Sequence, residues 1–495
     1  MLYYSTRNKN NRVTASKAIL TGISQEGGLF VPERIPQLSK NDIDALRSIN
    51  YKGRAKYILK MYLSDFTDEE ISYCVEGAYT GTFDNENPAK LVNISDNKNI
   101  LELWHGPTCA FKDLALQILP YLMTVSAKKQ GDNEKIIILV ATSGDTGKAA
   151  LEGFKDVKGT GIIVFYPNGG VSATQRLQMV SQNGDNVNVC AIDGNFDDAQ
   201  TAVKSIFTNK DIKNELKKHN MAFSSANSIN WGRLLPQIVY YVSAYCDLLN
   251  NNENLSDGFN ICVPTGNFGN ILAAYYAEQM GIPVNKLICA SNINNVLTDF
   301  INTGIYNKNR PFTLTTSPSM DILVSSNLER LIFAMYNNCD NTVSSLQESL
   351  KKNGVYSVSD EVRNKINKLF YGNFCDDTAT ATTIKETYEK YNYLMDTHTA
   401  VAMNVYNKYV NETADKRPTV IASTASPYKF SAAVLSALGE NTNSDDFINI
   451  GVLSNKTRTK IPKSIEALKN AGVRFDKVCS RDNIADYVLR TLGIK

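Results

Sequence analysis

The chain has 495 residues, of which 43% are hydrophobic and 21% charged, a composition typical of a soluble globular protein with about two to four domains. Its formal net charge of +2 gives no electrostatic reason to expect nucleic acid or an anionic membrane as a partner. No apolar run approaches the roughly 20 residues that span a bilayer, and the first residues lack the apolar core of a secretion signal.

Residues 1–95 mix strand and helix patterns and predict an N-terminal domain. Beyond them, three β-branched runs each lead into a loop of glycines or small residues and then into a helical pattern. The runs with their loops are 135–141 with TSGDTG (142–147), 259–263 with PTGNFGN (264–270), and 418–422 with STASP (423–427). Such runs are typical of buried parallel strands.

The remaining elements complete an alternation of strands and helices. Further strands are predicted at 161–166, 186–192, 286–291 and 448–453, and helices at 197–207, 234–249, 327–336 and 464–472. We therefore predict an α/β fold with parallel sheets, divided into 1–95, 96–225 and 226–495, the last with a helical, polar insertion at about 300–395. In this fold class ligands bind at the carboxyl ends of the strands, where all three loops lie.

Lys112 lies in the segment LELWHGPTCAFKDL (101–114), after a Gly-Pro turn and where a helix is expected to begin. A lysine held there can be partly dehydrated, which lowers its pKa and frees the amine as a nucleophile. Such an amine can form a Schiff base with an aldehyde cofactor. An ordinary surface lysine near a helix start fits this segment at least as well, so the choice depends on the other loops.

The loop GNFGN at 266–270 can present consecutive backbone N–H groups at the start of a helix, an arrangement that cradles a phosphate. It has neither the Gly-Lys-Ser/Thr ending of a nucleotide P-loop nor the G-x-G-x-x-G spacing of a dinucleotide site. A plain strand-to-helix turn is the alternative.

Two other loops carry groups that bind anions. In TSGDTG, the hydroxyls of Ser143 and Thr146 could grip a carboxylate or phosphate, whereas Asp145 would repel an anion and should face a protonated phenol or imine. In NSINWGR (227–233), Ser228 accompanies Arg233, a natural bidentate clamp for phosphate or carboxylate. Capped helix starts would explain both loops without a ligand.

Cysteine and histidine usage argues against metal sites. The nine cysteines are scattered without a Cys-x-x-Cys pair, which predicts free thiols in a reducing, cytoplasmic compartment. The three histidines are too few for a His-rich metal cluster, and we predict no metal. His105 and His398 fit a structural role best, although His105 is a weak catalytic candidate because it lies seven residues from Lys112.

Taken together, the loops supply one nucleophilic lysine, one phosphate cradle, one hydroxyl-bearing loop and one further anion clamp. A cofactor with both an aldehyde and a phosphate fits this set, namely pyridoxal 5′-phosphate.

The segments HGPTCAFKD, TSGDTG, NSINWGR, PTGNFGN and STASPYKF resemble, in this order, the motifs of the threonine synthase family. Residues 14–33, 166–172, 193–200, 320–331 and 395–402 also resemble that family, so the likeness spans nearly the whole chain. The resemblance implies a tryptophan-synthase-β-like fold (fold type II), with pyridoxal phosphate in the cleft between two α/β domains.

The resemblance also implies residue roles. Lys112 matches the lysine that binds the cofactor covalently and acts in catalysis, Thr424 lies by the pyridine nitrogen, and Asp145 lies near the phenolic oxygen. The cofactor phosphate would be held by Gly266, Asn267, Phe268, Gly269 and Asn270. The substrate's carboxylate and phosphate would be bound by Ser143, Thr146, Ser228 and Arg233, with their division of labour left open.

The chain departs from the family pattern at two places. Pro120 falls eight residues after Lys112, where the family continues a helix, and should kink that helix or start a new one. Ser426 stands where many relatives carry histidine, so no histidine role transfers to it.

The implied activity is that of a carbon–oxygen lyase acting on phosphates, which converts O-phospho-L-homoserine and water to L-threonine and phosphate. One alternative is a pyridoxal-phosphate-dependent lyase that eliminates phosphate and releases 2-oxobutyrate. Another is a non-catalytic homologue that binds the cofactor. We expect a small-molecule substrate, neither nucleic acid nor membrane as a partner, and a monomer or homodimer.

Overall fold

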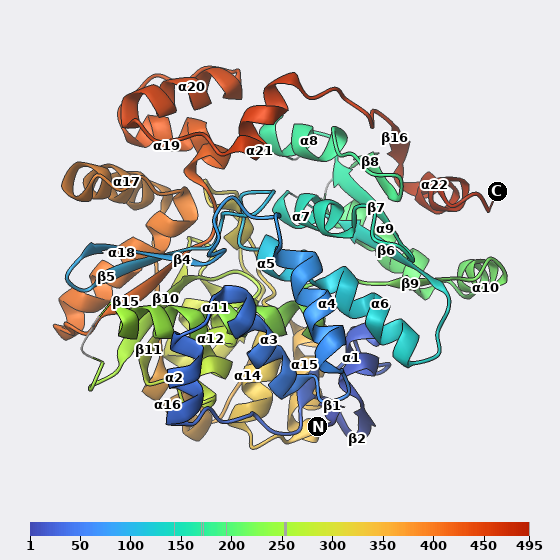
Figure 1. Cartoon of the computed structure of the whole chain (residues 1–495), viewed down its shortest axis with the longest axis horizontal. Coiled ribbons are helices and arrows are strands. Elements are labelled where there is room, and N and C mark those ends of the chain that lie inside the picture. Colours follow the sequence, from blue (N-terminus) through green and yellow to red (C-terminus); the bar gives the residue numbers. More distant parts are fainter. Residues whose placement is uncertain (143, 170, 172, 195, 252–254, 495) are drawn as a thin grey trace.

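Two mainly parallel β-sheets organise the described part of the chain in the computed structural model (Figure 1). The larger sheet has the strand order β14-β11-β10-β15-β5-β4 and is antiparallel only at β4. The smaller sheet has the order β16-β8-β7-β6-β9, with all neighbours parallel. The structure describes residues 1–494 except 143, 170, 172, 195 and 252–254.

The strands are β1 Tyr3–Ser5, β2 Asn8–Val13, β3 Phe30–Pro32, β4 Lys90–Ser95, β5 Lys98–Glu102, β6 Lys135–Ala141, β7 Thr160–Pro167, β8 Val187–Asp193, β9 Met221–Ser224, β10 Phe259–Pro264, β11 Val284–Ser291, β12 Ile305–Asn307, β13 Val355–Ser357, β14 Phe370–Phe374, β15 Thr419–Ser423 and β16 Val478–Ser480. Outside the two main sheets, β1 to β3 form an antiparallel sheet near the N-terminus and β12 pairs with β13.

The α-helices are α1 Ala15–Thr21, α2 Lys40–Arg47, α3 Tyr51–Tyr62, α4 Asp68–Tyr79, α5 Asp113–Leu116, α6 Leu119–Lys129, α7 Asp145–Phe154, α8 Ala173–Val180, α9 Phe196–Thr208, α10 Lys210–Lys218, α11 Trp231–Asn250, α12 Gly269–Gln279, α13 Val296–Thr303, α14 Leu328–Met335, α15 Asp340–Asn353, α16 Asp360–Leu369, α17 Asp377–Tyr391, α18 Thr397–Thr413, α19 Ser431–Ala437, α20 Asp446–Thr457, α21 Lys463–Glu466 and α22 Ile484–Thr491. Short 3₁₀ turns are η1 Pro318–Met320, η2 Pro427–Phe430, η3 Ala467–Asn470 and η4 Arg481–Asn483.

The strands of the smaller sheet are buried on both faces. Along β6, Ile136 and Ile138 belong to one core with side chains of α7 and α8, whereas Ile137 and Leu139 belong to another with α9 and α22. Because successive strand residues point to opposite faces, a strand covered on both sides reads as a continuous apolar run. The predicted α/β class with parallel sheets is confirmed.

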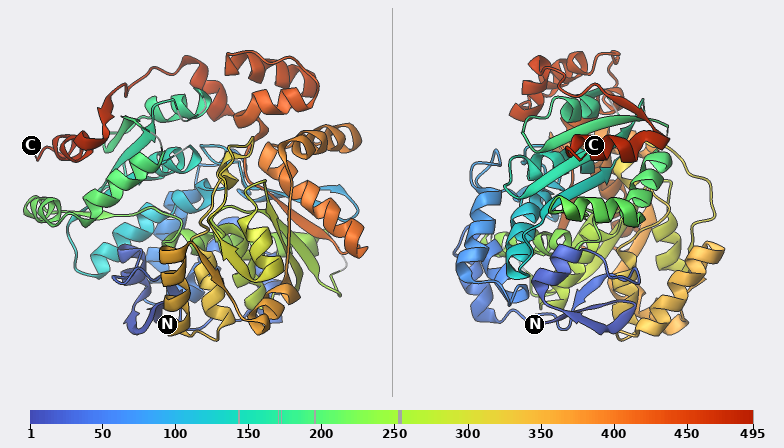
Figure 2. Two further views of the ribbon diagram at one scale, coloured as in Figure 1. Left: turned by 180° about the vertical axis from the view of Figure 1, so that it is seen from behind. Right: turned by 90° about the vertical axis from the view of Figure 1, so that its right-hand side faces the viewer.

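The two ends of the chain contribute to different sheets. Strands β4 and β5 enter the larger sheet, whereas β16, near the C-terminus, pairs with β8 of the smaller one. The C-terminal segment crosses the top of Figure 1 from α20 to β16 and α22, and the two termini lie apart in all views (Figures 1 and 2). The division into 1–95, 96–225 and 226–495 remains a prediction.

Three element predictions differ from the structure. In place of the helix predicted at 464–472, the chain forms the short α21 followed by the 3₁₀ turn η3. The strand predicted at 448–453 is wrong, because these residues lie inside α20. There the Asp445 side chain caps the helix start, and Asn449, Ile450, Leu453 and Thr457 are buried with helical spacing. The predicted insertion also contains β14, an unexpected edge strand that pairs with β11.

Pro120 begins a new helix rather than kinking one. Helix α5 ends at Leu116 and α6 begins at Leu119, so Pro120 lies in the first turn of α6. A first-turn N–H has no intrahelical acceptor, so proline costs nothing there. The second of the two outcomes expected for Pro120 is confirmed.

Helices α5 and α7 approach so closely at Gly153 that a Cβ there would lie 2.0 Å from the Leu116 carbonyl oxygen. We expect Gly153→Ala to lower the free energy of unfolding by at least about 2 kcal/mol, because backbone must move. Gly451→Ala in α20 is the control, since its Cβ would meet nothing within 4 Å. Denaturant unfolding of both variants checks this; equal stabilities would contradict it.

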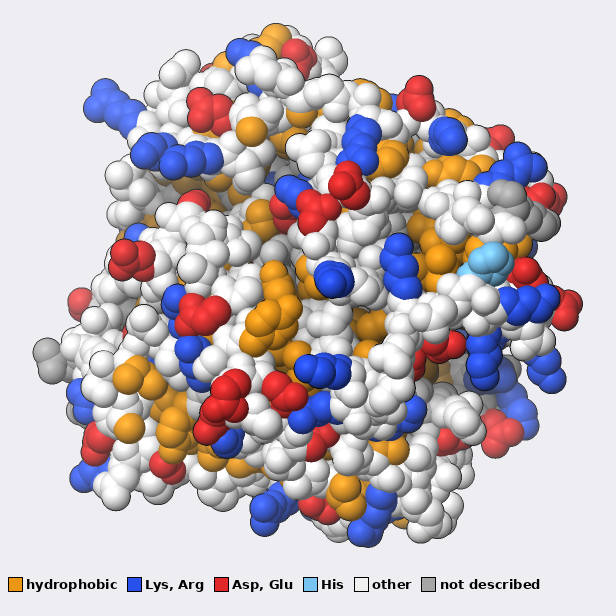
Figure 3. All heavy atoms as spheres, turned by 45° about the vertical axis from the view of Figure 1, so that its right-hand side comes forward, with side chains coloured by type: hydrophobic (Ala, Val, Ile, Leu, Met, Phe, Trp, Pro, Cys, Tyr) orange, Lys and Arg blue, Asp and Glu red, His pale blue; other side chains and the backbone are white. Residues whose placement is uncertain are grey.

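On the face of the molecule seen in Figure 3, acidic and basic side chains are interspersed, and no large patch of one charge sign is visible there.

Among the helices that the structure describes, none is long and apolar enough to cross a membrane.

Candidate active site

Lys112 lies immediately before α5, at the end of a loop fixed by polar contacts. The buried Asp113 carboxylate accepts hydrogen bonds from the Thr108 backbone N–H (2.8 Å) and hydroxyl (2.7 Å). Gly106 permits this packing, because a Cβ there would lie 2.5 Å from Asp113. Cys109 between them adopts a left-handed backbone (φ 56°), a strained conformation that tends to occur at functional sites.

The Lys112 amine points into a polar, largely enclosed environment. Its Nζ lies 3.4 Å from Ser319 Oγ and 3.7 Å from Asp145 Oδ2, and its side chain is 12% exposed. Burial lowers the pKa of Lys112, and the cations Lys429 and Arg233 lower it further, whereas Asp145 opposes the shift. Lys112 is therefore largely buried, as a dehydrated amine would be, and its role as the reactive amine stays a prediction.

Asp145, the first residue of α7, is the anionic centre of the site. Its carboxylate accepts from Lys429 Nζ at 2.5 Å and from Gln175 Nε2 at 3.1 Å. Burial alone would raise the pKa of Asp145, but the Lys429 and Lys112 ammonium groups hold it well below its ordinary value. Asp145 therefore stays ionised.

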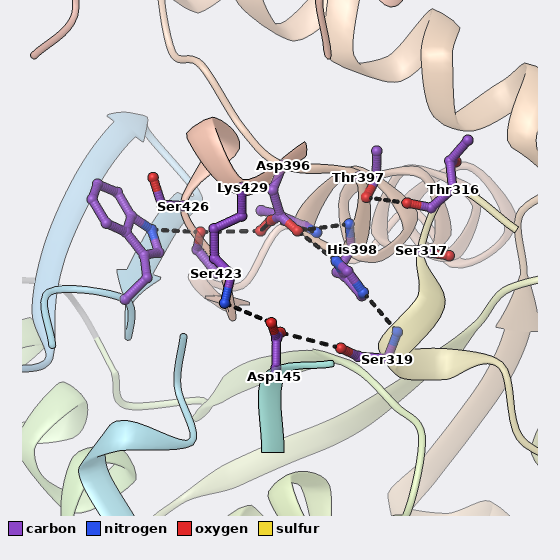
Figure 4. A network of polar contacts seen from close by, with 12 residues as sticks. Asp145, Thr316, Ser317, Ser319, Asp396, Thr397, His398, Ser423, Ser426 and Lys429 are labelled. Carbon is purple, nitrogen blue, oxygen red and sulfur yellow. Dashed lines mark hydrogen bonds and ion pairs between the residues drawn. The ribbon is translucent and has the colours of Figure 1, made fainter. Parts of the chain in front are cut away.

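A polar chain from α18 supports the segment beside Lys112 (Figure 4). The Ser319 backbone N–H donates to His398 Nε2 at 3.1 Å, and His398 Nδ1 lies 2.7 Å from the Asp396 carboxylate. Because a backbone N–H can only donate, Nε2 is the unprotonated nitrogen and Nδ1 carries the proton. His398 thus has the structural role expected of it, holding Ser319 in place.

The 266–270 loop leads from β10 into α12. Phe268 has a left-handed backbone (φ 64°) that turns the chain into the helix. Within the described residues, no protein acceptor receives a hydrogen bond from the backbone N–H groups of 267–270. The buried Asn270 Nδ2 also lacks a partner there, while its Oδ1 accepts from Tyr240 and Tyr241. These free donors at a helix start favour an anion.

The loop and the lysine meet at Ser319. A Cβ at Gly266 would lie 2.6 Å from the Ser319 carbonyl oxygen, while Ser319 Oγ lies 3.4 Å from Lys112 Nζ. The loop predicted to hold a phosphate and the lysine predicted to be reactive, far apart in sequence, therefore both contact Ser319.

Arg233 is a buried cation with few protein partners. The residue is 3% exposed and donates from Nη1 to the Ala226 carbonyl (2.8 Å), while its buried Nε has no partner within the described residues. Burial lowers the pKa of Arg233 to about 10, so it stays charged near neutrality. Among the described residues no carboxylate forms an ion pair with it. An uncompensated buried cation favours an anionic ligand.

The structure places the other predicted site residues on several different segments. Ser143 lies outside the described residues. Thr146 lies in the first turn of α7, and the Ser228 carbonyl accepts from Asn327 Nδ2 at 3.3 Å. Thr424 is buried beside the lysine loop, where its carbonyl accepts from the Phe111 N–H at 2.8 Å. Ser426 also joins that loop, donating from its N–H to the Cys109 carbonyl.

Three further residues tie the site together and were not predicted. Lys429 neutralises Asp145, Ser319 bridges the lysine and the cradle, and Asn327 donates to the carbonyls of Asn267 (3.2 Å) and Ser228 (3.3 Å). The motif STASPYKF contains Lys429, but nothing in its spacing indicates a partner in α7.

His105 is a structural ion-pair residue. Its Nδ1 lies 2.7 Å from Asp84 and its Nε2 3.0 Å from Glu102. Burial alone would lower the pKa of His105, but these carboxylates raise it to about 9. The catalytic candidacy of His105 gains no support from this position.

This raised pKa predicts a pH-dependent contribution to stability. It is fully present below about pH 6.5, the ordinary pKa of histidine, and is lost as pH rises through about 9. Because the Asp84 side chain is 43% exposed, solvent screens its charge and reduces the contribution. We therefore expect a loss in the free energy of unfolding on the order of 2 kcal/mol. Denaturant unfolding at several pH values should show this decline in the wild type and not in His105→Gln; parallel curves would contradict it.

Three protein families match the chain. They are described as "Threonine synthase N terminus" (residues 2–79), "Pyridoxal-phosphate dependent enzyme" (100–424) and "Threonine synthase, C-terminal" (399–488).

Individual relatives agree with this result. "Threonine synthase-like 1" of Homo sapiens is 39% identical over 86% of the chain, which spans 58% of that relative's length. "Threonine synthase" of Schizosaccharomyces pombe is 35% identical over 91% of each chain. The crystal structure of "PLP bound Threonine synthase from Brucella melitensis" superposes with a TM-score of 0.88 and 35% identity over 99% of both chains.

Proposed function

Since this chain belongs to the threonine synthase family of pyridoxal-phosphate-dependent enzymes, we propose that it converts O-phospho-L-homoserine and water to L-threonine and inorganic phosphate. This is a β,γ-replacement catalysed by a carbon–oxygen lyase. The observation that carries the proposal is the convergence of a dehydrated amine (Lys112), a loop of free N–H donors (267–270) and an unpaired buried cation (Arg233) around one site.

The residues present fit the cofactor. Pyridoxal phosphate has an aldehyde and a phosphate, and the site offers an amine for the first and free donors of 266–270, with the unpartnered Asn270 Nδ2, for the second. Thr424 is proposed to lie at the pyridine nitrogen and Asp145 near the phenolic oxygen. When bound, the cofactor supplies an electron sink for negative charge that develops on the substrate.

The chain's own groups then bind the substrate and move protons. Lys112, once its amine is free, acts as general base at Cα and later at Cβ, with Ser319 Oγ in reach of its Nζ. Arg233 binds an anionic group of the substrate and stabilises charge as phosphate leaves from Cγ. Ser143, Thr146 and Ser228 complete the binding of the carboxylate and phosphate. Cγ then gains a proton and becomes the methyl group, water adds at Cβ, and Cα is reprotonated, so that the two protons taken from Cα and Cβ are returned.

Two other activities use the same loops: phosphate elimination that releases 2-oxobutyrate, and cofactor binding without turnover. Product analysis separates them. Purified full-length protein incubated with phosphohomoserine should form threonine and equimolar phosphate. A keto acid instead of threonine would support the eliminating lyase, and a borohydride-sensitive yellow colour without phosphate release would support the binding protein.

We propose the cytoplasm as the compartment and a monomer or homodimer as the assembly. All nine cysteines lie in the described part of the chain and are free, most of them buried, which fits a reducing environment.

A further inference from the structure

Lys429 is the most completely buried cation of the site, with 0% of its side chain exposed. It follows the loop 423–427 and points toward α7 (Figure 4). Its ammonium group donates to Asp145 Oδ1 at 2.5 Å and to the Thr108 carbonyl at 3.0 Å. A lysine with no exposure is rare unless it is paired, and here both of its partners lie around the reactive amine.

The Asp145 carboxylate has two ammonium partners at unequal distances. Lys429 is at 2.5 Å from Oδ1, whereas Lys112 is at 3.7 Å from Oδ2. In a buried site the closer pair is much the stronger, because Coulomb energy rises as distance and dielectric fall. Asp145 is therefore already neutralised before Lys112 contributes any charge.

Other charged groups add to this imbalance. Lys112 is faced by Asp145 from α7, Lys429 from η2 and Arg233 from α11. His398 of α18 contacts the Ser319 backbone through its unprotonated Nε2 and the Asp396 carboxylate through Nδ1. Asp113, beside Lys112 on α5, directs its carboxylate to Thr108. If Lys112 were also protonated, three cations would surround one available carboxylate.

We propose that Lys429 is a positioning residue that keeps Asp145 committed to an ion pair, so that Lys112 can release its proton within the site. The inference rests on the proposed function, in which Lys112 is the reactive amine.

Of the two lysines beside Asp145, Lys112 is the one that loses its proton, because its position is the less favourable for a positive charge. It has the longer contact with Asp145, and the Lys429 charge repels its ammonium form. It also retains some exposure, 12% against 0% for Lys429, so its proton can leave. Without the Lys429 charge, Asp145 would be a buried carboxylate with Lys112 as its nearest ammonium, and that pair would hold the proton on Lys112.

The test measures the protonation of Lys112 directly in the full-length chain freed of cofactor. Limited acetylation with acetic anhydride over a range of pH, with mass spectrometry of the Lys112 peptide, gives the midpoint at which the amine becomes reactive. Lys429→Gln keeps a donor for Asp145 and Thr108 but removes the charge. We expect its midpoint to rise by about 1–2 pH units relative to the wild type.

Three further variants separate charge from packing. Lys429→Arg should keep the wild-type midpoint, and Lys429→Gln combined with Asp145→Asn should return it to the wild-type value or below, because no carboxylate remains to hold the proton. Lys148→Met is the matched control: this lysine on α7 is largely buried and pairs with Glu152 at 3.1 Å instead of with Asp145. It should leave the midpoint unmoved.

A folded Lys429→Gln protein with an unchanged midpoint would overturn the proposal. Should that variant not fold, the wild type decides, since acetylation of Lys429 at lower pH than Lys112 would reverse the assignment and refute it. Because labelling uses no substrate, it tests the role of Lys429 separately from the proposed function. A shifted midpoint without threonine formation would refute the proposed function and leave the role of Lys429 standing.

Discussion

Replacing Lys112 with alanine is expected to reduce threonine formation by at least about 10⁴-fold, the largest effect of any single change in this site. The variant loses the nucleophile that would bind the cofactor covalently and the base that would act at Cα and Cβ. No other amine takes its place, because Lys429 is fully buried and paired with Asp145 at 2.5 Å.

Two measurements check this expectation. The variant should release no phosphate from phosphohomoserine above background, and borohydride should fix no cofactor to the chain. Lys148→Ala is the matched control, because Lys148 is also largely buried and paired with a carboxylate, but its partner is Glu152 and not Asp145. Persisting turnover in a folded Lys112→Ala protein would exclude Lys112 as the reactive amine.

The parts of this site that sequence predicts are those encoded locally. The runs at 135–141 and 259–263 form buried parallel strands, as their apolar character indicates, and each leads into its loop and helix. The same local signals make Lys112 and the 266–270 loop candidates, because turn residues, glycines and a helix start lie within a few positions of one another. Only the combination of loops favours a site there, since each segment alone also fits a surface lysine or a plain turn.

Contacts between distant segments escape that reasoning. Ser319 and Asp145 are 174 positions apart, yet Oγ and Oδ2 lie 3.4 Å from each other. Lys429 likewise meets Asp145 only because η2 and α7 come together in the folded chain. A single sequence indicates which loops lie at strand ends, but not which charge faces which, since this depends on how two sheets pack.

The error at 448–453 has a different origin. The residues INIGVL alternate polar and apolar at first and contain β-branched side chains, a pattern that indicates a strand. Helix α20 forms nevertheless, because a capped start and the burial of Ile450 and Leu453 outweigh that local preference.

Replacing Arg233 with alanine is expected to lower kcat/KM for phosphohomoserine by about 10²–10³-fold while leaving the free energy of unfolding unchanged or higher. Both effects follow from its position. Among the described residues, the buried guanidinium donates to the Ala226 carbonyl and its Nε has no partner, so removing it relieves an uncompensated charge. The same removal takes away a bidentate clamp for the anionic substrate.

Arg54 provides the matched control, because it is similarly buried but paired with a carboxylate. It pairs with Asp247 at 2.6 Å and donates to the Leu46 carbonyl at 2.9 Å. Arg54→Ala should therefore destabilise the protein and spare kcat/KM of the folded fraction, the reverse of Arg233→Ala. Arg233→Lys, which keeps a point charge without the fork, should fall between wild type and alanine. Steady-state kinetics beside denaturant unfolding measures both quantities; an unchanged kcat/KM in Arg233→Ala would remove this arginine from substrate binding and leave its burial unexplained.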